Sequence, residues 1–360
     1  MIKDNLTPDK TLLKFNLKSL TLFLIFAVAL YFLVPKLLAE KHVFTLLLSV
    51  KKTYILLALV AELVSYVGAA TLMGVILSRL GYRISFKDRF RLGSIAAFAI
   101  HFLPISGLGE GVVDYYFLRR RKVTAGSIFL MLVLRIILTY SAFLILFIIA
   151  LLVVPAYPDF SFYSRIISVV LFILIALGAY YILALYRNKQ KFYKSIIKFS
   201  NLANKFLKIL RQKPISQAKI TEIYDDIYEG IGLFTHQRRS TLKAILGGII
   251  YWLGDMTCLY FVFLSLGHRI HFSVLIFGYS ISTLVGQISM IPGGLGVTEG
   301  AMSLVFSGIG IPISLTITAV LIFRFFSFWI WIPIGLFSYI TLKRENRKLA
   351  DGVDDQPTDS

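Results

Sequence analysis

Two glutamates in this chain are each followed, 25 residues later, by an arginine within apolar sequence: Glu110 by Arg135, and Glu299 by Arg324. An arginine inside a membrane costs about 2.5–3.5 kcal/mol on insertion scales, so it should face the protein interior and find a partner. The glutamates and nearby loop carbonyls are the expected partners. Each pair is either a static clamp or a site that releases its arginine to bind a phosphate group.

Each glutamate closes a glycine-rich break, "LPISGLGEG" (103–111) in the first case and "IPGGLGVTEG" (291–300) in the second. Pro104 and Pro292 are expected to end the helix before each break, because proline lacks a backbone donor and restricts the residue before it. Five glycines permit positive φ and close backbone approach: Gly107, Gly109, Gly293, Gly294 and Gly296.

The helix after each break points its free N–H groups into the loop, and such an end attracts an anion. Either the glutamate caps this helix or a lipid phosphate competes for the same place. Irregular backbone at membrane depth is tolerated only where it is buried in protein or lines a wet cavity.

Two aspartates are secondary candidates. Asp255 lies within an apolar run, whereas Asp114 could simply pair with the basic cluster 119–121. His268 and His271 form a short pair without a third ligand at metal-site spacing, which makes a zinc site a poor interpretation. We therefore predict no catalytic residue, metal or cofactor, and no enzymatic activity.

The elements that hold these residues are membrane helices. Of the 360 residues, 57% are hydrophobic and 16% are charged, compared with roughly 25% charged in soluble domains. Several apolar runs reach the ~20 residues that cross a ~30 Å hydrocarbon core. The predicted fold class is all-α, a polytopic membrane protein with full-length spans at 18–39, 54–80, 124–153, 164–186, 242–266 and 312–342.

Two further pairs of apolar segments each include a segment too short to cross a membrane. They are 92–104 with 111–118, and 272–291 with 299–308, and each pair flanks one glycine-rich break. About ten helical residues span only ~15 Å at ~1.5 Å per residue. We interpret each pair as a broken re-entrant hairpin that enters and leaves the membrane on the same side.

The chain also resembles itself. "YVGAATLMGVILSRLGYRISF" (66–86) aligns with "WLGDMTCLYFVFLSLGHRIHF" (252–272) at an offset of 186, and the hairpins align at 189. Repeat one covers about 54–153 and repeat two about 242–342. Three crossings separate their starts, so the copies have inverted topology. Inverted repeats with discontinuous helices are typical of transporters, which bind substrate near the midplane.

The net charge of +19 comes largely from loops on one side of this predicted topology. Residues 187–219 carry ten Lys/Arg and no acid directly after an apolar span, which indicates a cytoplasmic loop rather than nucleic-acid binding. We place both termini in the cytoplasm and this cytoplasmic basic loop at 187–241. A helix around 190–212 is amphipathic and either lies on the inner leaflet or packs on the bundle. Residues 344–360 read as an acidic disordered tail.

The stretch "SMIPGGLGVTEG", with Arg324 and "WIPIG" after it, resembles the transmembrane region of bacterial lysylphosphatidylglycerol synthase, the multiple peptide resistance factor, and its stand-alone flippase-like relatives. The resemblance covers about 15–343. It implies a lipid flippase fold in which two hairpins meet centrally; in the fused enzymes this region moves aminoacylated phospholipid to the outer leaflet. No aminoacyl-transferase domain follows here, so lysylphosphatidylglycerol synthesis is not expected.

The sequence thus predicts a cell-membrane transporter that moves a phospholipid or polyprenyl-phosphate lipid between leaflets by alternating access. The alternative is a non-transporting accessory or scaffold protein for a lipid-modifying or glycosyl-transferring enzyme. A third interpretation is a proton-coupled solute carrier. The expected partners are lipids with an anionic head group, together with a second copy of the chain or a lipid-modifying enzyme, and no nucleic acid.

Overall fold

The computed structural model describes residues 49–102, 108–154, 187–209, 238–289 and 292–351, with scattered residues between 166 and 228. The predicted span 18–39 lies outside the described residues, and only isolated residues of the span 164–186 are described. The described part of the chain folds into helices without strands, which confirms the all-α class.

Four helical stretches are long and apolar enough to cross a membrane. They are α3 (Lys52–Arg79), α6 (Ala125–Val153), α10 (Arg238–Ser265) and the continuous stretch Ile313–Glu345. The last consists of α13 (Ile313–Arg324), a π-helix (Phe325–Trp329) and most of α14 (Trp331–Asp351). Their bounds agree with four predicted spans, and the chain is an α-helical membrane protein.

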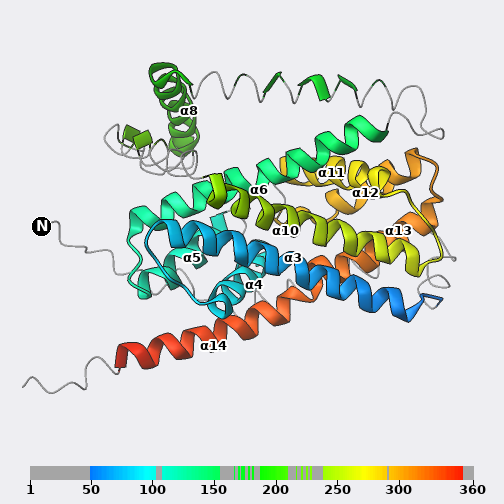
Figure 1. Ribbon diagram of the computed structural model, residues 1–360, viewed down its shortest axis with the longest axis horizontal. Coiled ribbons are helices and arrows are strands. Elements are labelled where there is room, and N and C mark those ends of the chain that lie inside the picture. Colours follow the sequence, from blue (N-terminus) through cyan, green and yellow to red (C-terminus); the bar gives the residue numbers. More distant parts are fainter. Residues whose placement is uncertain are drawn as a thin grey trace, which may run out of the picture.

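Two pairs of shorter helices accompany these spans. The first pair is α4 (Phe86–Phe102) and α5 (Leu108–Arg120), and the second is α11 (Phe272–Ile288) and α12 (Val297–Gly308). Figure 1 shows α4 and α5 in one half of the bundle and α11 and α12 in the other. This placement suits two hairpins of opposite orientation. That each hairpin enters and leaves on the same side stays a prediction.

The matching spans of the two repeats, α3 and α10, run antiparallel along their whole length. At one end the backbone N–H of Lys51 donates to the carbonyl of Ser265 at 2.9 Å. At the other end the Arg79 side chain donates to the hydroxyl of Ser240. Because equivalent helices point in opposite directions, the two repeats are inverted, as the sequence comparison predicts.

Glycines bring these two helices into backbone contact. A methyl group built on Gly68 would lie 2.5 Å from the backbone nitrogen of Tyr251, and one built on Gly254 would lie 2.6 Å from that of Ser65. The offset of 186 relates Gly68 to Gly254 and Ser65 to Tyr251. The two contacts therefore exchange under the internal two-fold axis, and they mark where that axis crosses the bundle.

The basic segments gather at one end of the bundle. There the turns after α3 and α5, the start of α10 and the end of α14 lie together (Figure 1). Arg91 binds Glu345 at 2.9 Å, and Arg121 binds Asp88 at 3.0 Å. This common location agrees with the charge argument, while its assignment to the cytoplasm stays a prediction.

The outer surface of the long helices is apolar. Leu56 is 62% exposed and Leu246 is 53% exposed, on the repeat-related helices α3 and α10. Inside, the apolar core forms two large clusters, with Phe143 and Phe263 among the residues of the first and Phe117 and Leu134 among those of the second. Apolar residues on both surfaces of a helix are typical of a bundle surrounded by lipid.

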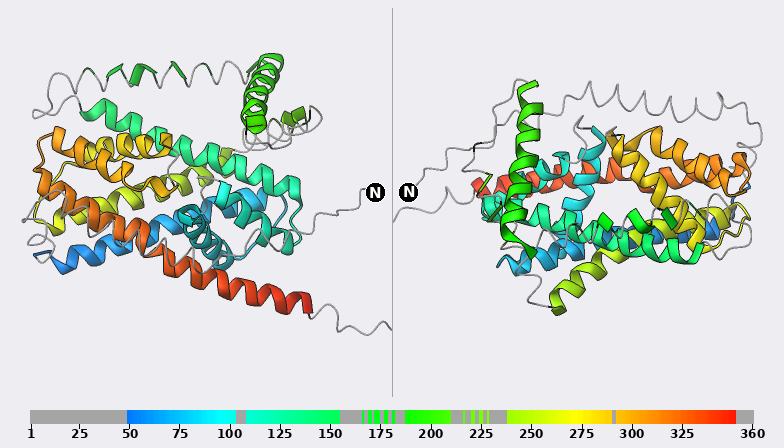
Figure 2. Two further views of the ribbon diagram at one scale, coloured as in Figure 1. Left: turned by 180° about the vertical axis from the view of Figure 1, so that it is seen from behind. Right: turned by 90° about the horizontal axis from the view of Figure 1, so that it is seen from above.

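Helix α8 (Lys189–Ile209) forms where the sequence predicts an amphipathic helix. It runs across the direction of the long helices in both Figure 1 and Figure 2. Its Phe192 and Tyr193 contact the rings of Tyr224 and Tyr228. An orientation perpendicular to the spans is what a helix on the membrane surface requires, and that location stays a prediction. At the other end of the chain, α14 continues to Asp351, past the predicted tail boundary at 343.

Candidate functional site

The second-half site is built around Arg324, which is 9% exposed. Its Nε donates to Oε1 of Glu299 at 2.7 Å, and its Nη2 donates to the carbonyl of Gly293 at 2.7 Å. The guanidinium lies 4.6 Å from the centre of the Phe328 ring. A carboxylate, a loop carbonyl and an aromatic face thus hold one buried cation, and the predicted pairing with both the glutamate and a loop carbonyl is present.

The glycine loop supplies the geometry of this site. Gly293, Gly294 and Gly296 have φ values of 61°, 63° and 79°, which residues with a Cβ rarely adopt. A methyl group on Gly294 would also lie 2.3 Å from Oγ1 of Thr298. The loop therefore needs glycine for both conformation and space. Pro292 begins the short 3-10 turn Pro292–Gly294, and α12 then starts so that Glu299 is its third residue.

A π-helical turn follows the arginine directly. Over Phe325–Trp329 the hydrogen bonding widens, so that the N–H of Ile330 donates to the carbonyl of Phe325 at 3.0 Å. Pro333 lies four residues after Trp329 and cannot donate to its carbonyl. The wide turn accommodates this missing donor, and π-turns of this kind are frequent at functional sites.

The first-half site places Arg135 of α6 against two carboxylates of α5. Its Nη2 lies 2.8 Å from Oε1 of Glu110 and 2.8 Å from Oδ2 of Asp114. The side chains of Arg135 and Asp114 are 13% and 1% exposed, whereas that of Glu110 is 32% exposed. The interpretation that Asp114 pairs with the basic cluster 119–121 is wrong, because Asp114 and Glu110 are one helical turn apart and face α6 together.

The break before this site is only partly described. Pro104 and Gly107 lie outside the described residues, so their predicted roles stay predictions. Gly109 was expected in the break, but it belongs to the first turn of α5 (Leu108–Arg120), because the helix begins earlier than the glycines suggest. Glu110 is consequently the third residue of α5, the same place that Glu299 has in α12.

Both arginines lie at a similar depth, measured from opposite ends. Arg135 is the eleventh residue of α6, and Arg324 is the twelfth residue of α13. At ~1.5 Å per residue each is roughly 15 Å inside its span, near the middle of a ~30 Å core. This similar depth agrees with the expectation for inverted repeats, while a location of both sites near the bilayer midplane stays a prediction.

Glu299 binds its arginine and does not cap its helix. Oε1 of Glu299 accepts from Arg324, and Oε2 is shielded from solvent with no hydrogen-bond partner in the described part of the chain. The alternative in which Glu299 caps α12 therefore does not describe this state. The N-terminal end of α12 thus lies next to a carboxylate of which only one oxygen, Oε1, accepts a hydrogen bond.

Apolar side chains join the two hairpins. Phe98 of α4 packs with Phe328 and Ile332, and Leu295 of the second glycine loop packs against the same cluster. Gly335 permits this contact, since a methyl group there would lie 2.4 Å from the carbonyl of Ser94 on α4. The helix pair of one repeat thus contacts the loop of the other.

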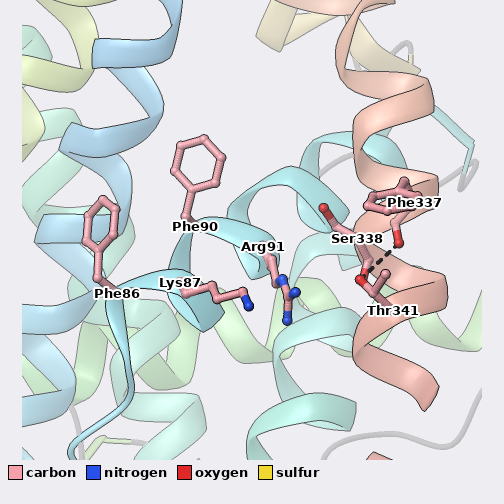
Figure 3. Close-up of a pocket in the computed structure, with 7 residues that line it drawn as sticks. All are labelled: Phe86, Lys87, Phe90, Arg91, Phe337, Ser338 and Thr341. Atoms are coloured by element: carbon pink, nitrogen blue, oxygen red, sulfur yellow. Dashed lines mark hydrogen bonds between the residues drawn. The ribbon is translucent and has the colours of Figure 1, made fainter. Parts of the chain in front are cut away.

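A groove of about 440 Å³ lies between α4 and α14 at the basic end of the bundle. Aromatic rings and cations alternate along its α4 wall, and small hydroxyl side chains lie on its α14 wall (Figure 3). Its residues are Phe86, Lys87, Phe90, Arg91, Phe337, Ser338 and Thr341. Sequence reasoning did not identify this groove, because its two walls are 250 residues apart in the chain.

A second site that sequence reasoning left incomplete surrounds Asp255. Tyr279 donates a hydrogen bond to its carboxylate, and Glu62 of α3 lies beside it. Glu62 is 2% exposed and was not among the predicted residues. It is the one acid of the apolar run 54–80, a signal that was present in the sequence.

Both arginine sites lie within a stretch that matches a known protein family. The family described as the lysylphosphatidylglycerol synthase TM region matches residues 19–335 of this chain. The chain belongs to this family. The synthase TM-region match includes both Glu–Arg pairs and both glycine loops, so the predicted resemblance is confirmed.

Two UPF0104 membrane proteins are similar in sequence to this chain. A UPF0104 membrane protein of Methanocaldococcus jannaschii is 25% identical over 338 residues, covering 93% of this chain and 98% of the relative. A UPF0104 membrane protein of Pyrococcus horikoshii is 35% identical over 128 residues, which is 34% of this chain and 38% of the relative. These names state a membrane location and no reaction or substrate.

Proposed function

We propose that this protein moves a lipid with an anionic head group between membrane leaflets by alternating access, without chemical conversion of the lipid. The observation that carries the proposal is the pair of buried arginine–glutamate sites, related by an inverted repeat and placed near the middle of the bundle. Each arginine is held by carboxylates next to the start of a short helix. A phosphate could replace the carboxylate on the arginine and gain the free N–H groups of that helix.

The lipid class follows from this chemistry. Arg135 and Arg324 offer a planar guanidinium, which binds phosphate through two parallel hydrogen bonds. Phospholipids and polyprenyl-phosphate lipids both carry such a group. The proposed location is the cell membrane, with the basic end of the bundle in the cytoplasm, in line with the positive-inside rule.

The groove between α4 and α14 offers a place for the lipid before it reaches these sites. Phe86, Phe90 and Phe337 suit acyl chains, and Lys87 and Arg91 suit an anionic head group. The Arg91 guanidinium contacts both carboxylate oxygens of Glu345, at 3.0 and 2.9 Å, which a phosphate could also compete for. In this proposal a lipid from the basic side rests in the groove and then moves toward the midplane.

The decisive experiment is a leaflet-resolved assay. Purified protein is reconstituted in vesicles that carry a labelled anionic phospholipid, a labelled polyprenyl phosphate or a labelled zwitterionic phospholipid. Faster exchange of an anionic label between leaflets, relative to protein-free vesicles, supports the proposal. Equal exchange of all three labels with and without protein contradicts it.

The same assay tests the groove. Replacing Lys87 with glutamine is expected to lower exchange of the anionic label about fivefold, because one basic residue near a membrane surface contributes about 1 kcal/mol to binding of the lipid. The matched control is Lys343→Gln, at the same end of the bundle but outside the groove lining. Equal effects of the two substitutions would show that the groove does not contribute to lipid exchange beyond the general positive charge at this end of the bundle.

An accessory or scaffold protein for a lipid-modifying enzyme is the second candidate. It is favoured by the apolar contact among Phe98, Leu295 and Phe328, which fills part of the junction between the hairpins with side chains. In this case lipid exchange would stay at the protein-free rate, and a partner enzyme would lose activity when the protein is removed.

A further inference from the structure

Two carboxyl groups that belong to neither arginine pair meet in the interior of the bundle. Glu62 on α3 and Asp255 on α10 lie at the close crossing of these antiparallel helices, where a methyl group on Gly254 would lie 2.8 Å from the carbonyl of Ala61, the residue before Glu62. Oε2 of Glu62 and Oδ1 of Asp255 are both shielded from solvent, and neither has a hydrogen-bond partner within the described residues. Tyr279 of α11 donates to the other oxygen of Asp255.

The groups around the pair do not neutralise two negative charges. The arginine that acts on Asp255 is Arg324, which already binds Glu299 and the carbonyl of Gly293. The other titratable groups that interact with the two carboxyls or with their neighbours are Tyr66, Cys258, Tyr251, Tyr279 and Glu110. The tyrosines and the cysteine are neutral near pH 7, and Glu110 adds a further acid.

Two like charges at close range in a low-dielectric interior cannot both persist, and such carboxyl pairs share a proton. The indole N–H of Trp331 adds a second, independent observation. Trp331 is 1% exposed, its Nε1 has no hydrogen-bond partner in the described part of the chain, and its ring lies beside Glu62. This donor is positioned to stabilise a carboxylate oxygen, so that one carboxyl can be ionised and the other protonated.

The pair occurs once, although the fold is duplicated. At the offset of 186, the counterpart of Glu62 is Gly248 and the counterpart of Asp255 is Ala69. Neither counterpart can hold a proton. The pair is therefore a single, asymmetric site, unlike the arginine sites, which occur in both halves.

We propose that Glu62 and Asp255 bind one proton between them, and that this proton is the one whose movement drives the lipid movement proposed above. The second half of this inference rests on the proposed function. On release, the carboxylic O–H bond breaks and the proton passes to water on one side of the membrane. Two carboxylates then face each other where α3 and α10 touch, and their repulsion favours a different packing of the repeats.

Infrared difference spectroscopy in lipid bilayers tests the proton site without any transport. Wild-type protein at about pH 7 is expected to show the C=O band of a protonated carboxylic acid, at a pH where exposed acids are ionised. Glu62→Gln and Asp255→Asn should each remove this band, while the exposed-acid control Asp225→Asn should retain it. Absence of the band in wild type, or its survival in both variants, overturns the site.

Vesicles with an imposed pH gradient test the coupling. With one proton moved per lipid, a gradient of about one pH unit should shift the steady-state lipid distribution between leaflets about tenfold. Glu62→Gln should abolish this shift. A wild-type distribution that ignores the gradient overturns the coupling, and a response to a sodium gradient at constant pH overturns the choice of the proton. If no lipid moves at all, the proposed function fails, and the infrared band still decides the proton site.

Discussion

Replacing Arg324 with glutamine is expected to lower lipid exchange about 30-fold or more in reconstituted vesicles. The substitution removes the cation that would bind the phosphate, and truncating one partner of a buried, hydrogen-bonded charge pair costs about 2–5 kcal/mol. Glutamine still offers an amide N–H toward Glu299, so helical content should be retained. The measurement is the exchange rate of the labelled anionic lipid per reconstituted protein, with helical content followed by circular dichroism.

A double substitution separates the two interpretations of this pair. In Arg324→Gln with Glu299→Gln, no buried charge is left unpaired, and thermal stability should return toward that of wild type. If the ion pair is only a clamp, exchange should recover with stability. If the arginine binds phosphate, exchange should stay low. The control Arg344→Gln removes a charge at the end of α14, and unchanged exchange is expected there.

Replacing Gly254 with alanine is expected to destabilise the protein by about 3 kcal/mol, at the upper end for overpacking, because the obstacles are backbone atoms. The added methyl group would lie 2.6 Å from the nitrogen of Ser65 and 2.8 Å from the carbonyl of Ala61. Neither can move without separating α3 from α10. Close approach of helices through small residues is the main source of packing between membrane spans.

The repeat supplies an internal replicate of this experiment. Gly68→Ala should have a similar effect, since its methyl group would lie 2.5 Å from the nitrogen of Tyr251. Gly126→Ala is the matched control, a helical glycine of α6 with open space around it. Thermal unfolding in detergent measures all three. If Gly254→Ala and Gly126→Ala unfold at the same temperature, the helices are not held in backbone contact.

The sequence predicts the main partners of the buried arginines, because a guanidinium in an apolar span must find an acid or a carbonyl. This reasoning led to Glu299 and a loop carbonyl for Arg324, and to Glu110 for Arg135. It also predicts the four spans that the described residues form and the inversion of the repeats, since both depend on segment length and self-similarity alone.

Residues that depend on packing between distant helices were not predictable in this way. Asp114 is close in sequence to three arginines, yet it binds Arg135 because the face of α5 that carries Glu110 also carries Asp114. Glu62 is recognised as a candidate site residue only when the fold places α3 beside Asp255. The π-helical turn after Arg324 was also not predicted, although Pro333, four residues after the end of that turn, is visible in the sequence.

The duplicated sites differ in the number of carboxylates that bind the arginine. Arg135 binds Glu110 and Asp114, whereas Arg324 binds Glu299, and the counterpart of Asp114 at the offset of 189 is Ser303. In the proposed transport cycle, a phosphate would displace two carboxylates from Arg135 but one from Arg324. We therefore expect the free-energy profile of the lipid to be tilted, with longer residence at the Arg324 half of the molecule.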